Sequence, residues 1–141
     1  MKVQDIMTRQ VIGIEPEETV EVAARQLAQY NIGVLPVTRK GKLCGMVTDR
    51  DLVIRCMAAN RTPGDPLVTD VMTKQVVSVQ PDMDAAVAAH LMGRQQIRRL
   101  PVTENGRLCG MLSLGDLACR EESVMDAADA LTDITANLST R

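Results

Sequence analysis

Aromatic residues are almost absent from this sequence. Its 141 residues contain no Trp, no Phe and a single Tyr, Tyr30. Nine Met, together with aliphatic side chains and Ala, must therefore fill the core, and methionine packs adaptably into irregular spaces. The shortage also argues against nucleic-acid binding, because single-strand binders stack bases on aromatic rings. The net charge of −2 likewise argues against a broadly basic surface for nucleic acid or anionic membranes.

Histidine and paired cysteines are also scarce. His90 is the one histidine, and the four cysteines, Cys44, Cys56, Cys109 and Cys119, form no C-x-x-C pair. Zinc sites need clustered Cys and His, and most general bases are histidines. We therefore expect no metal site and no enzyme activity, with His90 a structural or half-exposed residue on a helix. Cys44 and Cys109 are interpreted as small buried hydrophobes, with a redox switch as the alternative.

Long apolar runs are missing as well. No run reaches the length of a membrane span, and residues 1–5 lack the apolar core of a secretory signal. Hydrophobic residues make up 45% of the chain and charged residues 24%, which is typical of a globular protein. We expect a cytoplasmic protein with no membrane partner.

The chain contains an internal repeat. Shifted by 65 residues, it matches itself without gaps, and about twenty of some fifty aligned positions are identical. For example, the stretches Leu35–Thr38 and Leu43–Met46 recur unchanged as Leu100–Thr103 and Leu108–Met111. The predicted domains are a first repeat over residues 1–60, a linker over 61–67, a second repeat over 68–122, and a C-terminal helix and tail over 123–141.

Patterning within each repeat predicts a strand, a long helix, a two-strand hairpin and a final helix. Acidic starts and apolar spacing predict the long helices over Val20–Tyr30 and Ala85–Gln95. The dipeptides Lys40-Gly41 and Asn105-Gly106 predict the hairpin turns. The other expected elements are helical turns over Val3–Met7 and Val68–Met72, short strands over Val11–Ile14 and Val76–Val79, and a final helix reaching about Ala59 in the first repeat.

These elements predict a mixed α/β (α+β) fold. The strand–helix–strand order implies a parallel crossover, which an antiparallel hairpin follows. A unit of about sixty residues is marginal alone. We therefore expect two β-α-β-β-α repeats, related by a pseudo-twofold axis and packed sheet to sheet. Helical spacing at Val124, Ala128, Leu131 and Ile134 predicts an amphipathic C-terminal helix with a frayed end.

The last helix of each repeat opens at a hydroxyl residue followed three positions later by a carboxylate. The pairs are Thr48 with Asp51 and Ser113 with Asp116. Free N–H groups at a helix start attract phosphate, and an aspartate can accept hydrogen bonds from both hydroxyls of a ribose. The same pattern is also a capping box, in which both side chains serve only the helix. Its recurrence at one place in the repeat favours a nucleotide site.

Together these motifs resemble the cystathionine-β-synthase (CBS) domain family. The Asp5–Thr8 and Asp70–Thr73 openings, the Leu-Pro-Val strands, and the Gly45–Asp51 and Gly110–Asp116 endings occur in register twice. The tandem resembles a Bateman module over nearly the whole chain, and is similar to small stand-alone bacterial proteins. The resemblance implies a homodimer through the CBS repeats. It also implies clefts between paired repeats that bind adenosine-bearing ligands such as AMP, ADP, ATP or S-adenosylmethionine.

By this resemblance, Thr48 and Ser113 would contact phosphate, and Asp51 and Asp116 the ribose. Arginine suits phosphate binding, and the repeats differ in their arginines: Arg50 stands only in the first, and Arg98 and Arg99 only in the second. We therefore expect one site to bind better than the other, although these arginines could simply be solvated. The other residues implied in nucleotide binding are Thr8, Val11, Ile12, Val34, Leu35, Pro36, Thr73, Val76, Val77, Leu100 and Pro101.

The favoured interpretation is a regulatory module that senses an adenine nucleotide and signals to a separate effector protein. It requires no cofactor, and magnesium is a candidate companion of the nucleotide. One alternative is a nucleotide-independent scaffold or dimerisation protein. Another is a weak nucleic-acid binder that uses the small basic surface of Arg98, Arg99, Lys40 and Lys42.

Overall fold

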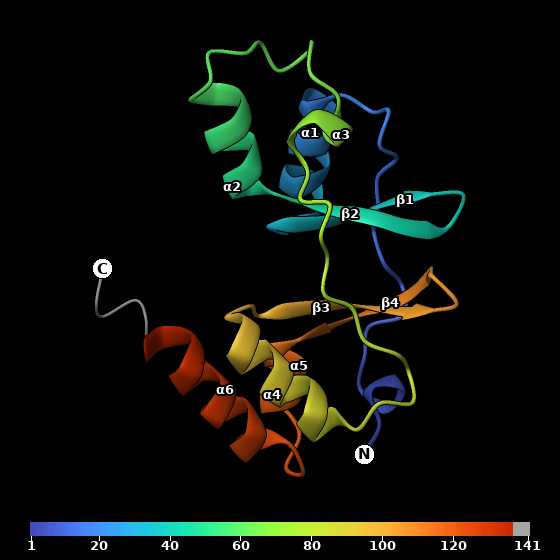
Figure 1. Cartoon of the computed structure of the whole chain (residues 1–141), viewed down its shortest axis with the longest axis vertical. Coiled ribbons are helices and arrows are strands. Elements are labelled where there is room, and N and C mark those ends of the chain that lie inside the picture. Colours follow the sequence, from blue (N-terminus) through green and yellow to red (C-terminus); the bar gives the residue numbers. More distant parts are fainter. Residues whose placement is uncertain (137–141) are drawn as a thin grey trace. The chain divides into compact units, whose positions relative to one another are not determined.

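The computed structural model describes residues 1–136 and contains two compact units, each built on one β-hairpin. The hairpin-1 unit is Ile12–Val76, and the hairpin-2 unit joins Met1–Val11 to the chain from Val77 onward. The units therefore exchange segments relative to the sequence repeats. Residues 1–11 pack with the second repeat, and residues 68–76 pack with the first (Figure 1). The predicted frayed end, residues 137–141, lies outside the described residues.

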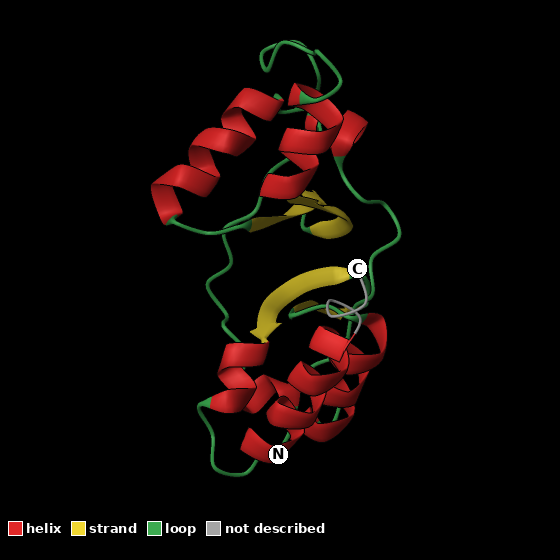
Figure 2. Ribbon diagram, turned by 90° about the vertical axis from the view of Figure 1, so that its left-hand side faces the viewer, coloured by secondary structure: helices red, strands yellow, loops and turns green. Residues whose placement is uncertain are grey.

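Within each unit, the helices gather on one side of the hairpin (Figure 2). The hairpin-1 unit contains α1 (Val20–Tyr30), β1 (Val34–Arg39), β2 (Lys42–Thr48), α2 (Asp49–Leu52), the π-helix η2 (Val53–Met57) and α3 (Val68–Val71). The hairpin-2 unit contains the 3₁₀ turn η1 (Val3–Asp5), α4 (Ala85–Gln95), β3 (Arg99–Glu104), β4 (Arg107–Ser113), α5 (Leu114–Ala118) and α6 (Val124–Ala136). The mixed α+β class with a C-terminal helix is confirmed.

Both long helices have the predicted bounds, because local signals set their ends. The Thr19 hydroxyl accepts a hydrogen bond from the Val22 N–H at 3.2 Å at the start of α1. The Asp84 carboxylate does the same for the Ala86 N–H at 2.8 Å at the start of α4. Each helix ends at a left-handed residue, Asn31 or Gln96, which is a common way to stop a helix.

Both hairpin turns are confirmed. The two central residues of each turn have positive φ, at 52° and 83° for Lys40-Gly41 and at 54° and 79° for Asn105-Gly106. This backbone matches the right-handed twist of antiparallel strands. The turns fix equivalent registers, so Pro36 lies opposite Met46 and Pro101 opposite Met111.

The predicted strands over Val11–Ile14 and Val76–Val79 shrink to single parallel bridges, Ile14 to Val37 and Val79 to Val102. The Ile14 N–H donates to the Pro36 carbonyl at 3.1 Å, and the Ile14 carbonyl accepts from Thr38 at 2.9 Å. Extending this ladder would need an N–H at Pro36 in one direction and at Pro16 in the other. Proline has no backbone N–H, so the ladder stops after one residue.

The C-terminal helix α6 exists, but its predicted apolar face is only partly right: Ile134 is buried, whereas Val124, Ala128 and Leu131 are exposed. Ala127 and Ala130 are the other buried residues of the helix. The helix packs on α4 and α5 (Figure 1). A glycine at position 93 permits the contact, since a Cβ there would lie 3.3 Å from the Ala130 Cα. Close approach of two small-residue faces, rather than the largest side chains, decides which side of α6 is buried.

Candidate functional site

Both predicted hydroxyl–carboxylate pairs form capping boxes. Asp51 Oδ2 accepts the Thr48 N–H at 3.0 Å, and Thr48 Oγ1 accepts the Asp51 N–H at 3.0 Å. The corresponding distances for Ser113 and Asp116 are 2.8 Å and 3.0 Å. The capping interpretation is therefore realised in both units. Each cap uses only Oδ2 of its carboxylate. Because an ionised carboxylate can accept at both oxygens, Oδ1 remains able to accept hydrogen bonds.

A second segment pairs with each hairpin two residues before its capping box. In the hairpin-1 unit, Thr73 and Met46 exchange backbone hydrogen bonds of 2.8 Å and 3.0 Å. In the hairpin-2 unit, Thr8 and Met111 do so at 2.8 Å and 2.9 Å. The structure thus places Thr73 with the Thr48–Asp51 box and Thr8 with the Ser113–Asp116 box, which the repeats alone did not reveal.

Glycines make these two backbone pairings possible, because each segment crosses close over its hairpin. A Cβ on Gly45 would lie 2.7 Å from Met72 Sδ and 2.9 Å from the Thr73 carbonyl oxygen. A Cβ on Gly110 would lie 2.7 Å from Met7 Sδ, and 3.0 Å from the equivalent carbonyl oxygen. Any side chain would therefore push the crossing segment away from the strand.

The predicted site residues divide into two sets, one on each unit. Leu35 and Leu100 are fully buried, and Pro36 and Pro101 are buried as well. Only backbone atoms of these four residues can therefore serve a ligand. The hairpin-1 unit holds Ile12, Val34, Leu35, Pro36, Thr48, Arg50, Asp51, Thr73 and Val76. The hairpin-2 unit holds Thr8, Val11, Val77, Arg98, Arg99, Leu100, Pro101, Ser113 and Asp116.

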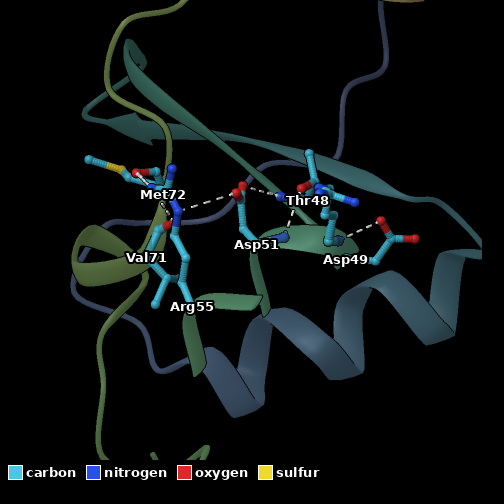
Figure 3. A network of polar contacts seen from close by, with 7 residues as sticks. Thr48, Asp49, Asp51, Arg55, Val71 and Met72 are labelled. Carbon is cyan, nitrogen blue, oxygen red and sulfur yellow. Dashed lines mark hydrogen bonds and ion pairs between the residues drawn. The ribbon is translucent and has the colours of Figure 1, made fainter. Parts of the chain in front are cut away.

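Arg55 is a residue that the sequence interpretation missed. Its Nη1 donates to the carbonyl oxygens of Val71 and Met72, each at 3.2 Å, and its Nε lies 3.8 Å from Asp51 Oδ1 (Figure 3). The spacing of four between Asp51 and Arg55 on one helix was a usable signal, because such residues are neighbours on the helix surface. The contacts with α3 depend on the tertiary fold and left no trace in the sequence.

The three arginines predicted at the sites are exposed. Arg50 lies on α2 in the hairpin-1 unit, where its backbone N–H donates to Asp49 Oδ1 at 2.8 Å. Arg99 begins β3 and Arg98 directly precedes it, and the Arg98 carbonyl accepts the Leu114 N–H at 2.8 Å. Their side chains lie in solvent, which is compatible both with solvated arginines and with contacts to a phosphate.

The two equivalent cysteines, Cys44 and Cys109, are half-buried. Cys44 Sγ donates to the Val37 carbonyl at 3.3 Å, and Cys109 Sγ to the Val102 carbonyl at 3.4 Å. Burial raises the pKa of both thiols above the usual 9.0; nearby acidic residues add to this increase, and Arg39 and Arg9 partly oppose it. A raised pKa disfavours the reactive thiolate, which supports their interpretation as small hydrophobes.

Within residues 1–136, no three His, Cys, Asp or Glu side chains group so as to hold a metal ion. Over the same part of the chain, no helix has the length and apolar character needed to cross a bilayer.

Comparison with known proteins identifies the fold. The CBS domain family model matches residues 3–57 and 68–122. CBS domain-containing protein YhcV of Bacillus subtilis is 42% identical over 94% of both chains. The crystal structure of Hypoxic Response Protein I with two coordinated zinc ions has a TM-score of 0.77 and 30% identity, covering 84% of this chain and 97% of that one. The CBS domain pair of protein MJ0100, solved with 5′-methylthioadenosine and S-adenosyl-L-methionine, has a TM-score of 0.73 and 26% identity, covering 84% and 93%. This chain therefore belongs to the CBS domain family and carries two CBS domains.

Proposed function

We propose that this protein is a regulatory module that binds adenosine-containing ligands at one site on each unit. The observation that carries the proposal is that Asp51 and Asp116 each cap a helix through Oδ2 alone, so that Oδ1 takes no part in the cap. The CBS domain pair of MJ0100 supports the ligand class, since both of its ligands contain adenosine.

The chemistry of each site follows from its acceptors and donors. A ribose diol donates hydrogen bonds to Asp51 Oδ1 or Asp116 Oδ1. The Thr48 and Ser113 hydroxyls accept from the helix through their oxygens, so each O–H remains able to donate to a phosphate. The exposed arginines supply positive charge for phosphate oxygens. This division of roles favours nucleotides over free nucleosides.

Substitution of the aspartates by asparagine tests the proposal without removing the cap. In Asp51→Asn and Asp116→Asn, the amide oxygen can still accept the N-cap N–H, while an NH₂ group replaces the oxygen that accepts from ribose. Since a hydrogen bond to a charged group contributes about 1.5–3 kcal/mol, affinity at the substituted site should fall roughly tenfold or more. Isothermal titration with AMP, ATP, S-adenosylmethionine and NAD, with and without magnesium, measures the loss.

Thermal unfolding supplies the control for this experiment. A ligand that binds only the folded protein raises its melting temperature with concentration, whereas the asparagine variants without ligand should melt close to the wild type. If none of the four ligands binds the wild type, the nucleotide-independent scaffold becomes the better interpretation. Turnover of ATP in the presence of magnesium would contradict a purely regulatory role.

We further propose that the two sites differ in affinity and that the protein acts on its effector as a homodimer. Arg50 and Arg55 flank the Asp51 box, whereas Gly115 and Arg120 occupy the equivalent positions near Asp116. Equal losses of affinity in the two asparagine variants would contradict this asymmetry. The apolar surface suited to self-association is on η2, where Val53, Ile54 and Met57 are 49%, 51% and 69% exposed.

A further inference from the structure

Arg55 joins the capping box to the segment that crosses the first hairpin. Its Nη1 holds the carbonyl oxygens of Val71 and Met72 at 3.2 Å, and its Nε faces Asp51 Oδ1 at 3.8 Å (Figure 3). The Asp51 side chain is 13% exposed and that of Arg55 50%. The guanidinium therefore lies beside the carboxylate oxygen that the cap does not use.

The carbonyls that Arg55 holds directly precede Thr73. Met72 is buried against Gly45, and Thr73 pairs with Met46. The segment therefore contacts β2 as well as Arg55. An arginine is suited to this junction because its planar fork of donors can serve several acceptors at once. Arg55 thereby links the orientation of Asp51 to the position of the Thr73 segment.

The hairpin-2 unit lacks this link. Arg120 is the repeat equivalent of Arg55, but α5 ends at Ala118, and Arg120 lies beyond the helix. Within the described residues, the Arg120 side chain makes no hydrogen bond or ion pair. The chain turns here because the buried Ser123 donates its hydroxyl to the Leu117 carbonyl at 2.7 Å, whereas the first repeat has Ala58 at this position and continues as η2.

We propose that Arg55 is a positioning residue for the Asp51 site and makes it the tighter of the two ligand sites. This inference rests on the proposed function. By holding Asp51 and the Thr73 segment before a ligand arrives, Arg55 reduces the ordering that binding must impose. Its positive charge also offsets the carboxylate and so lessens the repulsion of a phosphate. Arg120 supplies neither effect at the Asp116 site.

The test uses the full-length protein with one site weakened by its asparagine substitution. In the Asp116→Asn background, titration with AMP, ATP and S-adenosylmethionine reports the Asp51 site, and Arg55→Ala should lower its affinity roughly fivefold to thirtyfold. Arg55→Lys keeps the charge without the planar fork and should give an intermediate loss. The matched control is Arg120→Ala in the Asp51→Asn background, where affinity at the Asp116 site should change less than about twofold.

A purely structural role would change both sites alike. Arg55→Ala is therefore also made in the Asp51→Asn background, where the Asp116 site should keep its affinity. Loss at both sites, or a Thr73 amide that exchanges with solvent no faster in Arg55→Ala than in the wild type, would overturn the inference. If the wild type binds at the Asp51 site and Arg55→Ala binds equally well, the inference fails while the proposed function stands. If the wild type binds none of the three ligands, both fail.

Discussion

At the scale of single residues, the glycines at positions 45 and 110 determine how a distant segment reaches each site. Each glycine faces a methionine sulfur, from Met72 or Met7, at a distance that leaves no space for a Cβ. Methionine suits this contact because its flexible thioether fits irregular spaces. In a chain with nine Met and one aromatic residue, two of the Met thus fill close contacts beside the proposed ligand sites.

Gly45→Ala should lower the free energy of unfolding by about 1–3 kcal/mol, the usual cost of overpacking. The Met72 sulfur can move aside, but the backbone carbonyl of Thr73, 2.9 Å from the new Cβ, can shift only with its strand pairing. Urea denaturation measures the effect. The control is Gly64→Ala, whose Cβ would meet only Glu21 Oε2 at 3.5 Å and should change stability by less than about 0.5 kcal/mol. Equal stabilities of the two variants would show that the Gly45 contact is not tight.

At the scale of elements, the two repeats diverge after their capping boxes. The first continues through α2 into the π-helix η2, where the Ala58 N–H donates to the Val53 carbonyl at 2.7 Å. The second stops after α5 and turns into α6. The continuation brings Arg55 to α3 and exposes an apolar surface on η2, so one structural difference underlies both the proposed asymmetry of the sites and the proposed dimer surface.

Met57→Lys should weaken the proposed homodimer while leaving the fold intact. Its side chain is 69% exposed, so the substitution should change the free energy of unfolding by less than about 0.5 kcal/mol. A lysine desolvated in an apolar interface would oppose association. Sedimentation velocity over a concentration series measures the dimer fraction. Met125→Lys, at a 71% exposed position on α6, is the matched control. If Met125→Lys dissociates the dimer and Met57→Lys does not, the interface lies on α6 and not on η2.

At the scale of the whole molecule, the chain forms its two cores from exchanged segments. Val3 lies in the core that contains α4 and β4, although the first repeat supplies it. Val68, its repeat equivalent, lies in the core that contains α1 and β1. Each residue is fully buried. The similar sequence signals at residues 3–8 and 68–73 therefore each stabilise the opposite repeat.

Val3→Ala and Val68→Ala test this exchange. Each should cost roughly 2 kcal/mol, from the lost methyl groups and the cavity left behind. Amide hydrogen exchange should show which unit is destabilised, since units of a protein can open separately. Val3→Ala should accelerate exchange in α4, and Val68→Ala in α1. Faster exchange in α1 after Val3→Ala would contradict the assignment of residues 1–11 to the hairpin-2 unit.

Much of the fold could be predicted because its signals are local. The capping residues Thr19 and Asp84, the turn at Asn105-Gly106 and the duplicated spacing each act over a few residues. The errors concern contacts between distant residues. The single-residue parallel bridges depend on where Pro36 meets Ile14, and the buried face of α6 depends on Gly93. At the site, the hydroxyl–carboxylate pairs were found, but Arg55 was not.

The sequence by itself determined the duplication, the order of helices and strands, and the two capping boxes, because propensity, turn chemistry and side-chain spacing are properties of neighbouring residues. Only the tertiary structure decided which opening segment joins which hairpin. Thr8 and Thr73 end the same motif, so the choice depends on the core into which each segment packs. The tertiary structure also decided that Arg55, and not Arg120, reaches from a capping box to the crossing segment. That contact requires three elements to meet in space, and no local pattern encodes their meeting.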